Sequence, residues 1–399
     1  MSDSTIKYDI DFLFELGTLR NIRRSWDQLS PETFENVTEH TFKTAWISII
    51  LSKYIKQKFN KIKLLLMAFS FNIYKTRCGD AHYISYINIK QNKEKAIFDS
   101  LKDTSQEISI SELIKEYLLG DSIEAKIVYT SNILADILEL TELERSSLEI
   151  AKIWKNLNQK YNRKVIKISA GKKLWKAIIN SHPHNWHLSS KNRFCFKHKD
   201  FTPNNGIEGD IDFLYEISSL KFIQRNWVQF VGYAFSNLLE HLFRTVWLTI
   251  ILSSYEKKIN IPDAIITAMI HDLHEIRGCD VNYISSQYVR RDKQKAIKQT
   301  LKNTSIKKEI LSFWKKFENQ TSKEAKLVKD ADSLEPILEL KEQESLGVDI
   351  TKTWLELNIK RLKKNLNTKT AKLFLKQIIK SNPHNWHLNA KNRFKSGWK

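Results

Sequence analysis

Residues 240–253 read EHLFRTVWLTIILS, and residues 39–52 read EHTFKTAWISIILS. In both stretches a Glu-His pair opens a long apolar run, a pattern that favours a buried helix. Two further pairs of stretches repeat at nearly the same spacing: DIDFLFELGTLRNIRRSW (9–26) with DIDFLYEISSLKFIQRNW (210–227), and PHNWHLSSKNRF (183–194) with PHNWHLNAKNRF (383–394). A single long period that runs along almost the whole chain indicates two copies of one globular domain.

The joint between the copies is predicted where turn-forming residues gather. The segment 198–209 reads HKDFTPNNGIEG, and its Pro, Asn and Gly residues are typical of a linker. We therefore expect a first domain over residues 1–197, a linker over 198–209 and a second domain over 210–399. Each copy has a usual size for one domain.

The composition favours an all-α fold. The 399 residues include only 10 Gly and 6 Pro, fewer than the turns of sandwiches, barrels or Rossmann-type folds require. Within the second copy, apolar residues recur at intervals of three and four over 264–276 and over 324–340, which predicts two amphipathic helices. Pro262 and Asp263 mark the expected start of the first of them.

Charge and cysteine content bear on partners and compartment. The formal net charge is +20, which invites a nucleic-acid partner, but 14 of the 65 basic residues are Arg, the residue that base and phosphate recognition favours. Nucleic acid is thus possible but not favoured. The longest apolar runs, such as VWLTIIL (246–252), fall short of the ~20 residues that cross a bilayer, so we expect no membrane span. Three cysteines and a charged start without a signal peptide predict a cytoplasmic protein.

A candidate site lies in the second copy, where residues 270–275 read IHDLHE. On one helix, His271 and Glu275 lie a turn apart and Asp272 lies beside them. An imidazole and a carboxylate suit a divalent metal, with a second carboxylate as acid or base. Alone, such a short motif is weak evidence.

Further metal-ligating residue types flank this motif. His241 belongs to the Glu-His pair upstream, and KLVKDADSLE (326–335) offers Asp330 and Asp332 downstream. These two aspartates lie two residues apart on one predicted helix, so their side chains point in different directions. Helical periodicity does not choose between them.

With these residues, the second copy resembles the HD-domain metal-dependent phosphohydrolases, in particular their 5′-deoxynucleotidase-like branch. Four elements carry the resemblance, in this order: Arg225 with Trp227, Glu240 with His241, His271-Asp272-x-x-Glu275 with Asp280, and Asp332 with Leu334 and Glu335. The resemblance implies a divalent cation (Mn, Co, Mg, Fe or Zn) on four ligands: His241, His271, Asp272 and Asp332.

The resemblance also implies a reaction. A divalent ion lowers the pKa of bound water and polarises a phosphoryl oxygen, and Glu275 as the catalytic carboxylate would move a proton to the leaving 5′-oxygen. Arg225 is implied as the phosphate contact and Asp280 as the sugar contact. Trp227 either flanks the nucleoside or packs in the core. The substrate would be a small nucleotide, and the products a nucleoside and phosphate.

Two departures from the family pattern affect the expected substrate pocket. The Gly-Asp pair of the family reads Cys279-Asp280 here, and Ser236-Asn237 replaces the polar pair that usually precedes the first Glu-His. Arg277 is either a surface charge or, since it has a counterpart in the first copy, Arg77, a further residue that faces the phosphate.

The first copy lacks most of this site. His40 remains, but Phe71, Asn72, Lys75 and Asn132 stand where the second copy has His271, Asp272, Glu275 and Asp332. Phe is no ligand and Asn is a weak one, so we expect one divalent ion per chain. The resemblance implies a homodimer, because hydrolases of this kind commonly form one. We therefore expect the inactive copy to replace the second subunit, so that the chain is a monomer that forms an intramolecular pseudo-dimer.

The repeated PHNWHLxxKNRF tail is unexplained by the resemblance. Trp186 and Trp386 are expected to anchor it to the helices, while the histidines of each copy, three residues apart, form an alternative metal site. Three classes of function stay open: a 5′-nucleotidase or another HD hydrolase acting on nucleoside polyphosphates, a nucleotide- or RNA-binding regulatory protein, and a scaffold with a structural metal.

Overall fold

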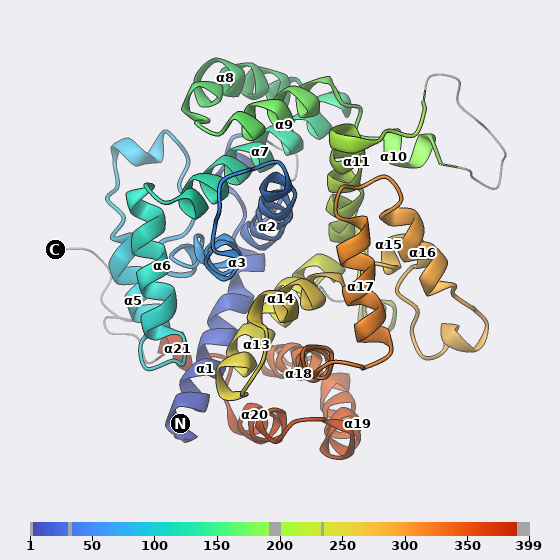
Figure 1. Ribbon diagram of the computed structural model, residues 1–399. Helices are drawn as coiled ribbons and strands as arrows, with labels where there is room; N and C mark the ends of the chain where they lie inside the picture. Colours follow the sequence, from blue (N-terminus) through green and yellow to red (C-terminus); the bar gives the residue numbers. More distant parts are fainter. Residues whose placement is uncertain (1–2, 31–33, 191–200, 233–234, 389–399) are drawn as a thin grey trace.

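The computed structural model describes residues 3–30, 34–190, 201–232 and 235–388. These residues form helices and connecting loops, and their only β-type pairings are two isolated bridges, Arg23–Asn36 and Gln224–Asn237. The predicted all-α class is therefore confirmed (Figure 1). None of the described helices is long and apolar enough to cross a membrane.

The two copies have matching series of helices. The first copy contains α1 (Asp3–Gly17), η1 (Thr18–Asn21), η2 (Ser25–Gln28), α2 (Val37–Lys53), α3 (Lys61–Ser70), α4 (Lys75–Cys78), η3 (Ser85–Ile87), α5 (Lys93–Leu101), α6 (Glu107–Leu119), α7 (Ile123–Arg145), α8 (Glu149–Val165), α9 (Ser169–Asn180) and α10 (Asn185–Leu188). The second contains α11 (Gly206–Ser218), η4 (Ser219–Phe222), α12 (Val228–Val231), α13 (Leu238–Tyr255), α14 (Ile261–Ile270), α15 (Glu275–Gly278), η5 (Ser285–Gln287), α16 (Lys293–Thr300), α17 (Lys307–Glu318), α18 (Lys323–Ser345), α19 (Ile350–Asn365), α20 (Lys369–Lys380) and α21 (Asn385–Leu388).

Helices α2 and α13 form the centre of the molecule. Each begins with a capping box, in which an Asn side chain accepts a hydrogen bond from the backbone N–H of a Glu three residues on, and the Glu side chain accepts one from the backbone N–H of the Asn. The pairs are Asn36 with Glu39 in α2 and Asn237 with Glu240 in α13. Nearly every residue of both helices is buried. The apolar runs that follow the two Glu-His pairs give each helix apolar residues on all sides, as expected of a helix in the core. One hydrophobic core extends through both copies.

The first helix of each copy packs against the other copy. In Figure 1, α1 lies beside α13, α20 and α21. The Phe12 ring of α1 meets Trp247 of α13 edge to face at 5.5 Å, and Phe213 of α11 meets Trp46 of α2 in the same way at 5.2 Å. These matching contacts bury large aromatic side chains between the copies.

Polar contacts between the copies follow the same twofold pattern. The amide of Asn36 donates to Glu240 at 2.7 Å, and the amide of Asn237 donates to Glu39 at 2.8 Å. The hydroxyl of Tyr255 likewise donates to a carboxylate of α1, and that of Tyr54 to one of α11, each at 2.6 Å. Each contact from the first copy to the second is matched by an equivalent contact from the second copy to the first, as in a twofold interface. The expected pseudo-dimer is thus present within the fold.

The end of the expected linker overlaps the first helix of the second copy. Helix α11 begins at Gly206, so residues 206–209 are helical, while 198–200 lie outside the described residues. Gly209 packs closely against the backbone before α17, and a Cβ there would lie 2.3 Å from the backbone oxygen of Asn303. This close packing explains why a glycine stands inside the helix.

The described part of the repeated tail contacts the first helices. The amide of Asn185 in α10 donates to Asp212 of α11 at 2.6 Å, and Trp186 and Trp386 pack against the common core. The histidines of each tail pair with each other, His184 with His187 and His384 with His387. Residues 191–194 and 391–394 of the tail lie outside the described residues.

Candidate metal centre

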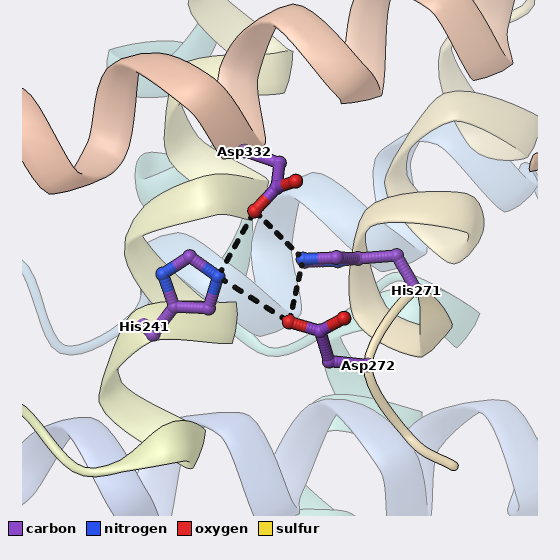
Figure 2. Close-up of side chains that lie close together, drawn as sticks. All are labelled: His241, His271, Asp272 and Asp332. Atoms are coloured by element: carbon purple, nitrogen blue, oxygen red, sulfur yellow. Dashed lines mark ion pairs between the residues drawn. The ribbon is translucent and has the colours of Figure 1, made fainter. Parts of the chain in front are cut away.

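Four predicted ligands from three parts of the second copy converge on one point. His241 comes from the first turn of α13, His271 directly follows α14, Asp272 lies in the next turn and Asp332 comes from α18 (Figure 2). One ligand atom from each of the four lies within 4.8 Å of all the others.

The individual distances are short and nearly equal. Nε2 of His241 lies 3.3 Å from Oδ1 of Asp332 and 3.7 Å from Oδ2 of Asp272. Nε2 of His271 lies 3.4 Å from each of the same two oxygens. Ligands at about 2.1 Å from one tetrahedral metal ion would be separated by about 3.4 Å. The four donor atoms therefore match the spacing that a single divalent ion requires.

The donor atoms also have the chemistry that a cation needs. Nε2 of His241 and Nε2 of His271 are both buried and have no hydrogen-bond partner. Buried polar atoms without partners are rare and require an explanation, which a metal ion provides here. Two imidazoles and two carboxylates form a ligand set common for Zn, Fe, Mn and Co. The described residues thus fit a divalent ion.

The carboxylates favour a positive charge at this point. Burial would lower the pKa of the His271 imidazole, but Asp272 and Asp332 outweigh that effect and raise the pKa to about 9. Neighbouring anions stabilise any cation in this place. A divalent ion would supply that charge and leave both imidazoles neutral.

The helix expected over 264–276 is interrupted, which corrects the sequence interpretation. Helix α14 ends at Ile270, and residues 271–274 form tight turns before the short α15. The backbone N–H groups of Leu273 and Glu275 bond three residues back rather than four. Nδ1 of His271 meanwhile donates to the carbonyl oxygen of Ala268 at 2.8 Å, which leaves Nε2 for the metal. The tightened turns place Asp272 beside His271.

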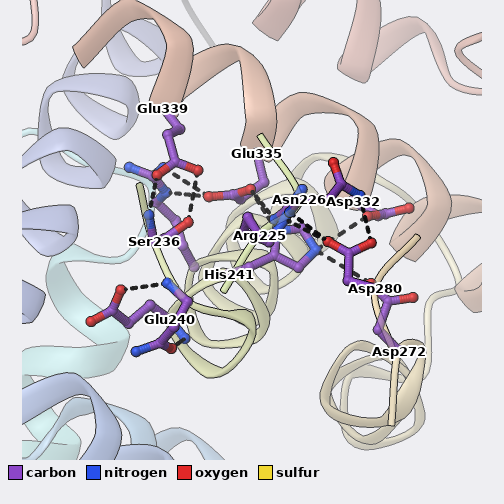
Figure 3. Close-up of polar contacts among 12 residues, drawn as sticks. Arg225, Asn226, Ser236, Glu240, His241, Asp272, Asp280, Asp332, Glu335 and Glu339 are labelled. Atoms are coloured by element: carbon purple, nitrogen blue, oxygen red, sulfur yellow. Dashed lines mark hydrogen bonds and ion pairs between the residues drawn. The ribbon is translucent and has the colours of Figure 1, made fainter. Parts of the chain in front are cut away.

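A buried carboxylate orients His241. Oε2 of Glu335 accepts a hydrogen bond from Nδ1 of His241 at 2.5 Å (Figure 3). Oε1 of Glu335 accepts a bond from Nε of Arg244 at 2.9 Å, and Glu335 is fully buried. A carboxylate behind a ligating histidine fixes its tautomer and strengthens it as a ligand.

The first copy contributes to this arrangement. Nη1 of Arg244 donates to both oxygens of Glu342, at 2.7 and 2.8 Å, and Arg20 of η1 donates to Glu342 at 3.2 Å and to Glu339 at 3.1 Å. A chain of ion pairs therefore runs from Arg20 in one copy to His241 in the other.

Glu275 lies beside the metal ligands at the start of α15. One of its carboxylate oxygens belongs to a compact group with Asp272 and His274, within 4.8 Å. Nη1 of Arg291 donates to Oε1 of Glu275 at 2.9 Å. Burial, together with the nearby charges of Asp272 and Asp280, raises the pKa of Glu275 to about 9. A carboxyl group in this state holds a proton near neutral pH.

The two proposed substrate contacts, Arg225 and Asp280, are neighbours. Nε of Arg225 lies 3.9 Å from Oδ2 of Asp280, and Nη1 of Arg225 lies 3.5 Å from Oε2 of Glu335. Asp280 accepts hydrogen bonds from the backbone N–H and the amide of Asn226, at 3.1 and 2.8 Å. These long contacts leave the Arg225 guanidinium with donor capacity beside the metal ligands.

Trp227 is half-buried in an aromatic group. Its ring lies 5.3 Å from Trp354, edge to face, and 5.9 Å from Phe235. These contacts fit the core-packing interpretation of Trp227. A role beside a nucleoside stays a prediction.

The structure separates the two aspartates that the sequence left open. Asp330 accepts four hydrogen bonds at 2.8–2.9 Å, from the backbone and side chains of Asn367 and Thr368, and so holds the start of α20. Asp332 faces the histidines and also accepts a hydrogen bond from Lys329 at 2.8 Å.

Arg277 does not face the site but pairs with the first helix of its copy. Its guanidinium donates to Glu216 of α11 at 2.5 and 2.8 Å, and Arg77 of the first copy donates to Glu15 of α1 at 2.7 and 2.8 Å. Both arginines hold a first helix in place, which explains why both copies have them.

In the first copy, hydrogen bonds between protein groups take the place of ligands. Nε2 of His40 bonds the side-chain oxygen of Asn132 at 2.7 Å, and Arg24 bonds Nδ1 of His40 at 3.1 Å. His40 also lies near the carboxylates of Glu35 and Glu139. Both carboxylates already form ion pairs: Glu139 with Arg24, and Glu35 with Lys43 and Lys221. Burial, together with the charges of Arg24 and Lys43, holds the pKa of His40 well below its usual value.

Sequence reasoning missed the residues that support the ligands. In the sequence, Arg244 stands within an apolar run and Glu335 within a motif, and neither pattern indicates a role behind a ligand. A charged residue inside an apolar helix needs a buried partner, so Arg244 was the available signal. Arg291 carried no comparable signal, because it lies in a polar loop.

Comparison with known proteins agrees with the tandem arrangement. The family model described as HD domain matches residues 16–175 and, again, residues 217–374. The 5′-deoxynucleotidase HDDC2 of Danio rerio is 29% identical over 151 residues, which are 35% of this chain and 72% of that protein. The Homo sapiens protein of the same name is 27% identical over 148 residues, which are 36% of this chain and 72% of that protein.

Among solved structures, a conserved hypothetical protein from Pyrococcus furiosus is 23% identical, with a TM-score of 0.38. That match covers 43% of this chain and 99% of the other. The family model matches most of the chain, once in each copy. The chain therefore belongs to the HD domain family.

Proposed function

We propose that the second copy is a metal-dependent phosphohydrolase that releases phosphate from (deoxy)nucleoside 5′-monophosphates. The convergence of four ligand atoms from His241, His271, Asp272 and Asp332 within 4.8 Å carries this proposal. The similarity to proteins named 5′-deoxynucleotidase supports the choice of substrate.

The residues of the second copy suit each part of this reaction. A divalent ion held by the four ligands would supply a Lewis acid for the phosphoryl group and an activated water molecule. Arg225 would bind the phosphate, because its planar fork of N–H donors matches phosphate oxygens. Glu275 lies next to the ligands and would give its proton to the leaving 5′-oxygen. Asp280 would accept a hydrogen bond from the sugar.

The direct test is phosphate release by the purified full-length chain. Nucleoside 5′-monophosphates, 3′-monophosphates and 5′-triphosphates would be compared, each with Mn²⁺, Co²⁺, Mg²⁺ and Zn²⁺. We expect turnover of 5′-monophosphates that chelation abolishes. Turnover of triphosphates alone would contradict the proposed substrate and would point to another HD-domain hydrolysis.

Two variants separate metal binding from catalysis. Glu275→Gln should retain the ion while the rate falls by about 10²- to 10⁴-fold, the usual contribution of a general acid or base. Asp349→Asn serves as a control, because this aspartate is exposed on the surface. Unchanged phosphate release by Glu275→Gln would contradict the role given to Glu275.

A further inference from the structure

The first copy contains a cavity where the second has its metal ligands. Its volume is about 600 Å³, in the usual range for small-molecule sites. His40, Phe71, Asn72 and Asn132, the positions that match the four candidate metal ligands, lie in its wall. The cavity is therefore the altered counterpart of the catalytic site.

Aromatic side chains form much of the cavity wall. The lining includes Trp26, Tyr74, Tyr86, Tyr117 and Trp154. Trp26 and Trp154 meet edge to face at 5.0 Å. Tyr74 stands at the position of His274 in the second copy, so the first copy has an aromatic ring where the second has an imidazole. Walls of this kind favour a ligand with a flat ring.

The same wall carries cationic side chains. Its charged residues are Arg24, Lys75, Lys93 and Asp80, and the Arg24 guanidinium also pairs with Asp136 and Glu139, at 2.6 and 2.8 Å. Lys75 stands where the second copy has Glu275, and its Nζ lies 2.7 Å from Asp80. Nε of Arg24 is buried and has no hydrogen-bond partner. Cationic donors beside an aromatic wall suit a phosphate joined to a base.

From this lining we infer that the first copy binds a nucleoside monophosphate without hydrolysing it. The base would lie among the aromatic rings, and the phosphate would face Arg24 and Lys75. The inference goes beyond the proposed function, since it concerns the other copy and requires no metal ion. With Asn72, Asn132 and Lys75 in place of carboxylates, the site lacks the groups for metal-dependent hydrolysis.

The test is calorimetric titration of the full-length chain in the presence of EDTA. The probes are adenosine, guanosine, cytidine and uridine 5′-monophosphates, the four nucleosides and inorganic phosphate. We expect one equivalent of at least one monophosphate to bind, more tightly than its nucleoside or phosphate alone. EDTA makes the result independent of catalysis, so failure of the proposed hydrolysis would leave this outcome unaffected.

Matched variants assign binding to a copy. Lys93→Ala in the cavity wall should weaken binding at least about 10-fold, a change that corresponds to about 1.4 kcal/mol. Lys293→Ala, its counterpart in the second copy, should not change it. Tyr86→Ala removes an aromatic side chain that is 50% exposed, so it tests the wall with little effect on folding. Circular dichroism would verify that each variant is folded.

Three results would overturn the inference. One is that no monophosphate binds to the folded chain in EDTA. Another is equal affinity for a nucleoside and its monophosphate, which would remove the role of Arg24 and Lys75. The third is equal loss of binding in Lys93→Ala and Lys293→Ala, which would place the ligand elsewhere.

Discussion

Nδ1 of His241 and Oε2 of Glu335 lie 2.5 Å apart in the buried centre of the second copy. This contact fixes the imidazole so that Nε2 faces the other three ligands. Glu335 is fully buried and is itself held by Arg244, so the metal ligand rests on a network of charges rather than on one side chain.

Glu335→Gln should therefore weaken metal binding without removing a ligand. The amide carries no charge, so it is a weaker acceptor for His241 and loses the ion pair with Arg244. We expect the metal affinity to fall by about 10- to 100-fold, the usual effect of a partner behind a ligating histidine. Titration of the metal-free protein with Zn²⁺ or Mn²⁺ measures it. An unchanged affinity would show that Glu335 does not support His241.

Asp332→Asn should affect metal binding, whereas Asp330→Asn should affect stability. Asp332→Asn should lose the ion, because Asp332 faces both histidines, and elemental analysis should then fall from one divalent ion per chain to none. Asp330→Asn should keep the ion but lower stability by about 1.5–3 kcal/mol, since Asp330 accepts four hydrogen bonds at the start of α20. Retention of metal in Asp332→Asn would contradict the ligand assignment.

Arg20→Gln should weaken the metal site from the other copy. Arg20 bonds Glu342, which pairs with Arg244 behind the Glu335–His241 contact. The effect is more remote than that of Glu335, so we expect an affinity loss of about 3- to 10-fold, below the usual range for a direct partner. Arg23→Gln is a matched control, as the Arg23 side chain is 72% exposed. Equal metal affinity in both variants would rule out support across the interface.

The second copy should not form a stable monomer in solution without the first copy. A fragment of residues 201–399 lacks α1, so the faces of α13 and α20 that α1 covers would be exposed to water. We expect this fragment to self-associate, whereas the full-length chain should sediment as a monomer. A stable monomeric fragment with full metal affinity would contradict the structural role of the first copy.

Glu39 should make stability depend on pH. Burial, together with the carboxylates of Glu35 and Glu240, raises the pKa of Glu39 to about 7, above the usual value of 4.5. A carboxyl whose pKa is raised on folding contributes stability below pH 4.5, and that contribution is lost as the pH rises through 7.

Denaturant unfolding between pH 4.5 and 8 measures this effect. The free energy of unfolding of the natural chain should decrease over this range by about 3 kcal/mol more than that of Glu39→Gln. Parallel pH profiles for the two proteins would show that Glu39 is not the group responsible.

The sequence by itself determined the duplication and the all-α class, and it predicted the candidate metal ligands. Each of these depends on patterns that are local or repeated: apolar residues spaced three and four apart, and His and Asp within short motifs. The loss of ligands from the first copy was equally visible, because Phe71 and Asn72 stand directly opposite His271 and Asp272 in the repeat.

Only the tertiary structure decided how these parts meet. It ended α14 at Ile270, directed Asp332 rather than Asp330 to the site, and turned Arg277 toward Glu216. It also placed the first helix of each copy on the other copy and opened an aromatic cavity beside Lys75. The physical reason is that side-chain direction and burial depend on contacts between residues far apart in the chain, which local periodicity does not specify.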